Sequence, residues 1–199
     1  RNNACVNCSC SNLGRQSLVG AKCRTQVCSR VRYRFVILLS DMGLRDGDGW
    51  VDCDCGFRHW GRFGAAGLLL VRRDTPQPQV LLQLRAEWTH GGGTWALPGG
   101  AKDSHEDSVT AALREAHEEM GIEESALTVK HIFSDNHGPW SYDTVIAHTM
   151  SDAGAHIANP ESTETKWSSI EEVETLNLHP GLKQSWVALK PLTADSLKN

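Results

Sequence analysis

The chain has 199 residues, of which 40% are hydrophobic, and its formal net charge is -4. This length and apolar fraction suit one domain with an extension, and the acidic balance argues against binding a nucleic acid over a broad surface. The charge is uneven: residues 1–41 contain seven Lys or Arg and one acid, whereas the rest contains thirteen basic and twenty-three acidic residues. No apolar run approaches the roughly eighteen residues that span a bilayer. We therefore expect no membrane association and a cytoplasmic location.

Residues 1–42 are predicted to form a basic, cysteine-rich and poorly ordered extension, because their apolar residues follow no helical period. A C-x2-C pair followed by a C-x4-C pair is loosely similar to the spacing of structural zinc sites. However, the second pair is wider than a usual zinc knuckle, turn glycines are missing and Cys10 is left over. We keep zinc as the alternative here, with the ligands Cys5, Cys8, Cys23 and Cys28.

Residues 43–64 are predicted to form a hairpin packed on the core. Trp50-Val51 indicates a short strand after a glycine-rich turn. Cys53-Asp-Cys55, followed by His59, could be half of a metal site, but a single intervening residue is a poor zinc spacing. We therefore interpret this segment as a tight hairpin and keep metal binding as the alternative.

Apolar stretches predict the strands of the main domain. Ala65 to Val71 is a continuous apolar run, as expected for a strand buried on both faces. Further strands are expected at 80–84, 127–133 and 142–149. A short capped helix is predicted from Ser169 to Val173, a terminal helix over 180–190 and a frayed tail over 191–199.

An acidic helix is predicted after the turn Pro98-Gly99-Gly100. Ser104 is the expected N-cap, with acids in the first turn, and Gly121 is the expected C-terminal glycine. Between them, apolar residues recur at spacings of three and four and define a core-facing stripe, namely Val109, Ala112, Leu113, Ala116 and Met120.

Three glutamates of this helix stand at positions i, i+3 and i+4, namely Glu115, Glu118 and Glu119. Their carboxylates therefore converge on one face, where like charges repel by a few tenths of a kcal/mol per pair. A divalent cation would turn this cost into binding energy, and hard oxygen ligands suit Mg²⁺ or Mn²⁺. The alternative interpretation is a solvated acidic face.

The pattern G-x5-E-x7-R-E-U-x-E-E-x-G-U, with U an aliphatic residue, runs from Gly100 to Ile122 and every fixed position is filled. It resembles the Nudix box, so the chain is identified as a member of the Nudix hydrolase family. The resemblance implies an α/β (α+β) fold over 65–190: an α/β/α sandwich with a mixed sheet that carries the box as loop, helix and loop. It also implies hydrolysis of a nucleoside diphosphate linked to another moiety.

The resemblance also implies roles for individual residues. Glu118 and Glu119 would be the principal metal ligands, and Glu115 would be a third ligand or the base that deprotonates the attacking water. The Gly100 carbonyl would be a backbone ligand. A further acid after the box would complete the metal shell or position the water, with two candidates: Glu161 and Glu164.

Other residues are expected to shape the box or to bind substrate. Glu106 and Arg114 would hold the box loop through an ion pair or through hydrogen bonds at the helix end, with Gly121 ending the helix. The loop before the box and the turn after it contribute candidate substrate contacts, because nucleobases stack well on aromatic side chains. These candidates, for which core packing is the alternative role, are Arg85, Trp88, His90, Trp140 and Tyr142.

The substrate stays open among ADP-ribose, a (deoxy)nucleoside triphosphate, a dinucleoside polyphosphate and a nucleotide sugar. Pro139 is a hint of the ADP-ribose branch, whereas the NADH branch's Ser-Gln-Pro-Trp-Pro-Phe-Pro-x-Ser motif is absent. The alternatives are a non-catalytic nucleotide-sensing module and an NADH pyrophosphatase with an N-terminal zinc site. The expected partner is a small nucleotide, with a homodimer possible because many family members are dimers.

Overall fold

A computed structural model describes residues 45–198, which belong to one compact unit. The predicted extension and the zinc alternative at Cys5, Cys8, Cys23 and Cys28 lie outside the described residues. None of the described helices is long and apolar enough to cross a bilayer.

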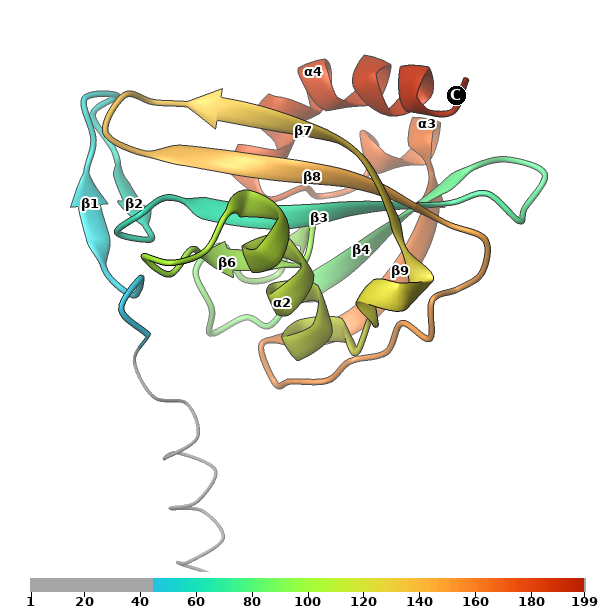
Figure 1. Ribbon diagram of the computed structural model, residues 1–199, viewed down its shortest axis with the longest axis horizontal. Helices are drawn as coiled ribbons and strands as arrows, with labels where there is room; N and C mark the ends of the chain where they lie inside the picture. Colours follow the sequence, from blue (N-terminus) through green and yellow to red (C-terminus); the bar gives the residue numbers. More distant parts are fainter. Residues whose placement is uncertain (1–44, 199) are drawn as a thin grey trace, which may run out of the picture. The chain divides into compact units, whose positions relative to one another are not determined.

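The predicted elements occur in the predicted order, and the strands β5, β6 and β9 were not predicted (Figure 1). The strands are β1 (Trp50–Asp52), β2 (Arg58–Trp60), β3 (Ala65–Arg72), β4 (Gln79–Arg85), β5 (Trp95–Ala96), β6 (Gly99–Ala101), β7 (Thr128–Asn136), β8 (Ser141–Thr149) and β9 (Ser162–Ser169). The helices are α2 (Ser108–Met120), the 3₁₀ turn η1 (Glu124–Ala126), α3 (Ile170–Val173) and α4 (Pro180–Ser196). The four main strands expected from the apolar runs are all present, and β7 runs further than predicted, to Asn136.

The central sheet is mixed, because β3 and β8 are parallel while the other neighbouring pairs are antiparallel. Its order is β5-β4-β3-β8-β7. Strands β3 and β4 pair only beside their connecting turn, at Val71 with Val80 and Arg72 with Gln79. Further along, β6 pairs with β3 and β9 pairs with β4, so the two strands separate. This separation leaves room at the sheet for the loop that leads into α2.

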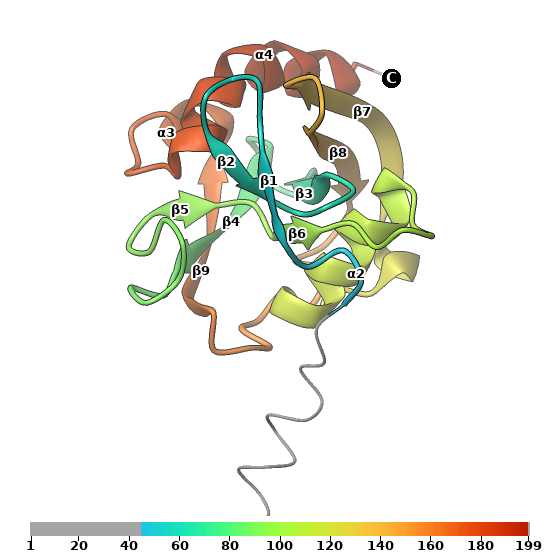
Figure 2. The same ribbon diagram turned by 90° about the vertical axis from the view of Figure 1, so that its left-hand side faces the viewer.

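The sheet is covered on both faces, since successive side chains of a strand point in opposite directions. On one face, Leu68 and Leu70 pack with α2; on the other, Leu69 and Val71 pack with α3 and α4. Figures 1 and 2 show the helices on the two sides of the sheet. The expected α/β/α sandwich with a mixed sheet is therefore confirmed.

Helix α2 begins later than predicted. Its N-cap is Asp107, whose side chain accepts a hydrogen bond of 2.7 Å from the Thr110 N–H. Ser104 is not the cap, because its hydroxyl and its N–H both donate to Asp46. The helix ends as predicted at Gly121, which has a left-handed φ of 64° and donates to the His117 carbonyl at 2.9 Å.

Two further predictions concern the C-terminal helices. Ser169 caps α3 in a reciprocal pair of hydrogen bonds with Glu172, as the sequence indicated. The prediction of a frayed tail after position 190 is wrong, because α4 continues through Pro191 to Ser196. Proline removes the hydrogen bond to the carbonyl of Val187, but Val187 is 82% exposed, so water can satisfy that carbonyl.

The hairpin β1–β2 contacts two parts of the core. The indole N–H of Trp140, in the turn between β7 and β8, donates to the Trp60 carbonyl at 3.1 Å. Ahead of the hairpin, the Gly47 N–H donates to the buried Asp103 at 3.2 Å. The hairpin therefore joins the β7–β8 turn to the loop that precedes α2.

Candidate active site

The most buried acid of α2 is Glu119, which is 4% exposed. Its Oε2 accepts hydrogen bonds of 2.8 Å from the Gln83 side chain and 2.8 Å from the Gly99 N–H. No hydrogen bond reaches its Oε1 from residues 45–198. The carboxylate is thus fixed by neutral donors on one oxygen, and the other oxygen is left for a ligand.

The electrostatics of Glu119 indicate an uncompensated charge. Burial, together with the charge of the neighbouring Glu115, raises the pKa of Glu119 to about 8. Burial also raises the pKa of Glu115, against the opposing effect of Arg114. Two desolvated carboxylates side by side are unfavourable without a cation, whereas Mg²⁺ or Mn²⁺ takes hard oxygen ligands. These residues therefore fit a divalent cation.

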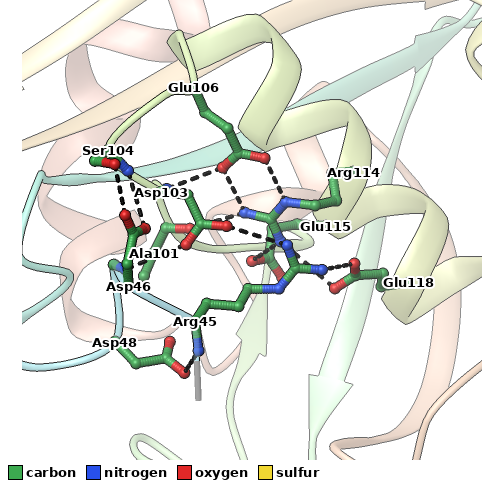
Figure 3. A network of polar contacts seen from close by, with 11 residues as sticks. Arg45, Asp46, Asp48, Ala101, Asp103, Ser104, Glu106, Arg114, Glu115 and Glu118 are labelled. Carbon is green, nitrogen blue, oxygen red and sulfur yellow. Dashed lines mark hydrogen bonds and ion pairs between the residues drawn. The ribbon is translucent and has the colours of Figure 1, made fainter. Parts of the chain in front are cut away.

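Arg114 holds the box together (Figure 3). Its Nε and Nη2 donate to the two oxygens of Glu106 at 2.6 and 2.8 Å, and Nη2 also donates to the Ala101 carbonyl at 2.9 Å. Nη1 donates to Glu115 at 2.7 Å. The ion pair expected between Glu106 and Arg114 is thus present, and the same guanidinium orients Glu115.

Glu118 faces outward, with 41% of its side chain exposed. It accepts from Arg114 at 3.4 Å and also from Arg45. Arg45 bridges to Asp103 at 3.2 Å, so its guanidinium lies across this side of the box (Figure 3). Positive charge from the chain therefore already surrounds the outermost of the three carboxylates.

Gly100 lies directly against Glu115. A methyl group at Gly100 would come within 2.6 Å of Glu115 Oε1, closer than any real contact of this kind. The glycine in this position therefore allows strand β6 and the carboxylate to share the space, and a side chain there would displace Glu115.

Replacing Gly100 with alanine should consequently lower kcat by on the order of 10²-fold while the protein stays folded, because a displacement of about 1 Å at a reacting group has that effect. Steady-state kinetics and circular dichroism check this. Gly181→Ala is the matched control, because its added methyl group would make only ordinary contacts, at 3.5 Å and beyond. Equal kcat values for the two variants would contradict the placement of Glu115 in the site.

The loop before the box lies partly near the glutamates. Arg85 is among the charges that lower the pKa of Glu119, and its Nε donates to the His90 carbonyl at 2.9 Å. The His90 ring contacts Trp50 edge to face, with centroids 5.7 Å apart. Trp88 is 68% exposed, so it lies at the surface.

The two aromatics after the box differ in their surroundings. Trp140 is 8% exposed and stacks on His59 with ring centroids 4.1 Å apart, so its role is packing rather than contact with a base. Tyr142 lies closer to the box, since a methyl group at Gly99 would be 2.7 Å from its hydroxyl. Burial and the charges of Glu119 and Glu115 raise the pKa of Tyr142.

The acids after the box are not joined to the three glutamates by any hydrogen bond or ion pair among residues 45–198. The Glu161 carbonyl accepts a hydrogen bond from the Ala86 N–H at 2.8 Å. Glu164, on β9, pairs with Leu84 on the neighbouring strand β4. The segment is nevertheless connected to the site, because Ser162 donates to the Gln83 side chain at 2.7 Å.

Gln83 was missed by the sequence reasoning. It is fully buried and bridges Ser162 to Glu119. The sequence does contain an indication, because Gln83 is the one amide side chain within the apolar stretch of β4. A buried polar side chain needs hydrogen-bond partners, so its position there indicates a specific contact. Arg45 and Asp103 were also missed, and no local signal pairs residues so far apart in the chain.

Two surface hollows, of about 520 and 410 Å³, share Val109 and Leu113, and neither is lined by any of the three glutamates. Of the three glutamates, only Glu118 is well exposed, and it lies beside Arg45.

A family model for the NUDIX domain matches residues 61–189. A Mycobacterium tuberculosis (strain ATCC 25618 / H37Rv) protein named "Putative 8-oxo-dGTP diphosphatase 3" is 47% identical over 161 residues, which cover 75% of this chain and 71% of that protein. A Bifidobacterium longum (strain NCC 2705) protein named "Nucleoside triphosphate pyrophosphatase/Nudix hydrolase fusion protein" is 41% identical over 70% of this chain and 30% of its own length.

Among solved structures, RenU, a Nudix hydrolase from M. smegmatis, matches with a TM-score of 0.69 and 45% identity, over 75% of this chain and 96% of that one. The sandwich and its acidic helix thus define a Nudix protein, and the chain belongs to this family. With relatives named as diphosphatase and pyrophosphatase, it is a hydrolase that acts on acid anhydrides.

Proposed function

We propose that this chain is a Mg²⁺- or Mn²⁺-dependent diphosphatase that cleaves a nucleoside triphosphate, with an oxidised deoxyguanosine triphosphate as the first candidate substrate. The observation that carries the proposal is the pair of desolvated carboxylates of Glu119 and Glu115 on helix α2. The candidate substrate comes from the 47% identical relative named for 8-oxo-dGTP.

In this proposal the metal ligands are Glu119 and Glu118, with the Gly100 carbonyl as a backbone ligand. When bound, the cation supplies charge neutralisation for the phosphate oxygens and makes water more acidic. Gln83 and Gly99 fix Glu119 through its Oε2, so that its Oε1 is presented in one orientation.

Glu115 is the candidate base or third ligand. Its Oε1 is held by Arg114, and its raised pKa makes it a better proton acceptor than an ordinary carboxylate. Water attacks one phosphorus of the diphosphate, Glu115 takes the proton, and the bridging P–O bond breaks. Arg85 is the candidate for binding a phosphate oxygen, because it lies near Glu119.

Glu161 and Glu164 remain candidates for completing the metal shell, and Trp88, His90 and Tyr142 remain candidates for substrate contact. The cytoplasmic location and the homodimer also remain predictions from the sequence. The unbroken box argues against a nucleotide sensor that does not cleave its ligand.

A panel of substrates tests the proposal directly. The full chain would be incubated with 8-oxo-dGTP, dGTP, ADP-ribose, a diadenosine polyphosphate and a nucleotide sugar, with Mg²⁺ or with EDTA, and the products separated by chromatography. We expect release of a nucleoside monophosphate and pyrophosphate from 8-oxo-dGTP in Mg²⁺ alone. Hydrolysis of another member of the panel would replace the substrate, and no hydrolysis of any would overturn the function.

A further inference from the structure

Four metal-binding side chains meet at the tip of the β1–β2 hairpin: Cys53, Cys55, His59 and His137. Each offers one ligand atom, and these four atoms all lie within 4.8 Å of one another. Three come from the hairpin and the fourth comes from the turn between β7 and β8. The cluster shares no residue with the candidate active site.

The hairpin turn fixes the first three donors. The Cys53 N–H donates to the Phe57 carbonyl at 3.0 Å, and the Gly56 N–H donates to the Cys53 carbonyl at 3.0 Å. Gly56 has a φ of 86°, which favours glycine and closes the turn. The Cys55 sulfur consequently lies 3.0 Å from Nε2 of His59 on β2.

The fourth donor is positioned independently by the β7–β8 turn. The His137 N–H donates to the Trp140 carbonyl at 2.9 Å, and the His137 carbonyl lies 3.2 Å from the Cys53 sulfur. Nε2 of His137 lies 3.3 Å from the Asp135 carboxylate. A carboxylate on one imidazole nitrogen is the arrangement that orients metal-binding histidines, and it leaves Nδ1 for the metal.

We propose that these four side chains bind a zinc ion in a structural Cys₂His₂ site. Two thiolates and two imidazoles are a preferred ligand set for tetrahedral zinc. Zinc bonds of about 2.0–2.3 Å place ligand atoms roughly 3.3–3.8 Å apart. The most distant ligand atoms of the cluster, which lie within 4.8 Å of one another, would therefore approach by up to about 1 Å, and Cys55 Sγ and His59 Nε2, now 3.0 Å apart, would separate slightly. All four coordination positions are filled by protein, which is typical of a structural site.

The single residue between Cys53 and Cys55 argued against zinc when the segment was read alone. The structure answers that objection, because the other two ligands do not come from a second knuckle. His59 reaches back from the return strand, and His137 comes from a distant turn.

The position of the site indicates what the metal does. It joins the hairpin to the β7–β8 turn, where stacking of His59 on Trp140 and the bond from Trp140 to Trp60 already hold the two segments together. The same hairpin carries Trp50, which contacts His90 of the loop before the box. Zinc would therefore hold the hairpin beside that loop.

Metal analysis of the purified 199-residue chain tests the site. Cysteines before residue 45 could also bind zinc, so the parent for this test carries serine at all five of them: Cys5, Cys8, Cys10, Cys23 and Cys28. After dialysis against zinc and then buffer, mass spectrometry of metals should find about one zinc per chain in this parent. Cys53→Ser with Cys55→Ser, or His137→Asn, should reduce the content at least about tenfold.

The matched control is His131→Asn, an exposed histidine on β7 outside the cluster, which should keep its zinc. If the cysteine variants do not fold, Co²⁺ added to the parent provides a second test. The absorption spectrum should then show the bands of tetrahedral Co²⁺ and of charge transfer from thiolate to the metal. A parent that binds no zinc, cysteine variants that keep it, or a disulfide between Cys53 and Cys55 in the isolated protein would overturn the proposal.

Discussion

Replacing Glu119 with glutamine is expected to lower kcat by about 10²-fold or more on any diphosphate that the enzyme cleaves. The substitution removes the negative charge that a cation requires. Steady-state kinetics in Mg²⁺ measure the effect. The matched control is Glu124→Gln, the same chemical change on the 3₁₀ turn after α2, outside the site. Near-normal turnover of the Glu119 variant would refute its role as a metal ligand.

The same variant should keep its fold and gain stability in EDTA. The glutamine carbonyl can still accept from Gln83 and Gly99. Because the folded state raises the pKa of Glu119 from 4.5 to about 8, its contribution to stability is present below pH 4.5 and is lost as the pH rises through about 8. The variant should therefore equal the wild type near pH 4.5 and exceed it near pH 9. Urea unfolding in EDTA at the two pH values checks this, and a wild type more stable at pH 9 would contradict it.

Replacing Arg114 with methionine should lower the free energy of unfolding by about 3–5 kcal/mol, because it leaves buried carboxylates without their partner. The Arg114 and Glu106 side chains are 15% and 3% exposed, and Glu115 would lose the same guanidinium. Urea denaturation followed by circular dichroism measures the loss. Arg72→Met is the matched control, since its ion pair with Asp74 is more exposed and its loss should lower the free energy of unfolding far less.

A double-mutant cycle separates this ion pair from general packing. Adding Glu106→Gln to Arg114→Met removes one of the stranded charges, so the double variant should be less destabilised than the sum of the two single variants. Simple additivity would show that Arg114 stabilises the box by packing alone.

The layers of the fold were predictable because they depend on local patterns. The apolar run at 65–71 indicated a strand buried on both faces. The structure places it in the middle of the sheet, between the two helical layers. The spacing of Glu115, Glu118 and Glu119 likewise fixed their common helix. The helix start was not predictable, because Ser104 is recruited by Asp46, which lies far earlier in the chain.

What the sequence could not predict depends on contacts between distant segments. Trp140 was a candidate for stacking on a nucleobase because it is aromatic. In the structure its ring stacks instead on His59, which lies on a hairpin far earlier in the chain. His137 joins Cys53 and Cys55 for the same reason. Arg45 contacts Glu118 across the box loop, and no periodicity links them.

The most direct test of the central claim is to locate a cation at α2. Crystals soaked in Mn²⁺, at a concentration that supports hydrolysis, should give an anomalous peak about 2.1 Å from the carboxylate oxygens of Glu119 and Glu118. A peak bound only by other residues, or none at all under those conditions, would contradict the assignment of this helix as the catalytic metal site.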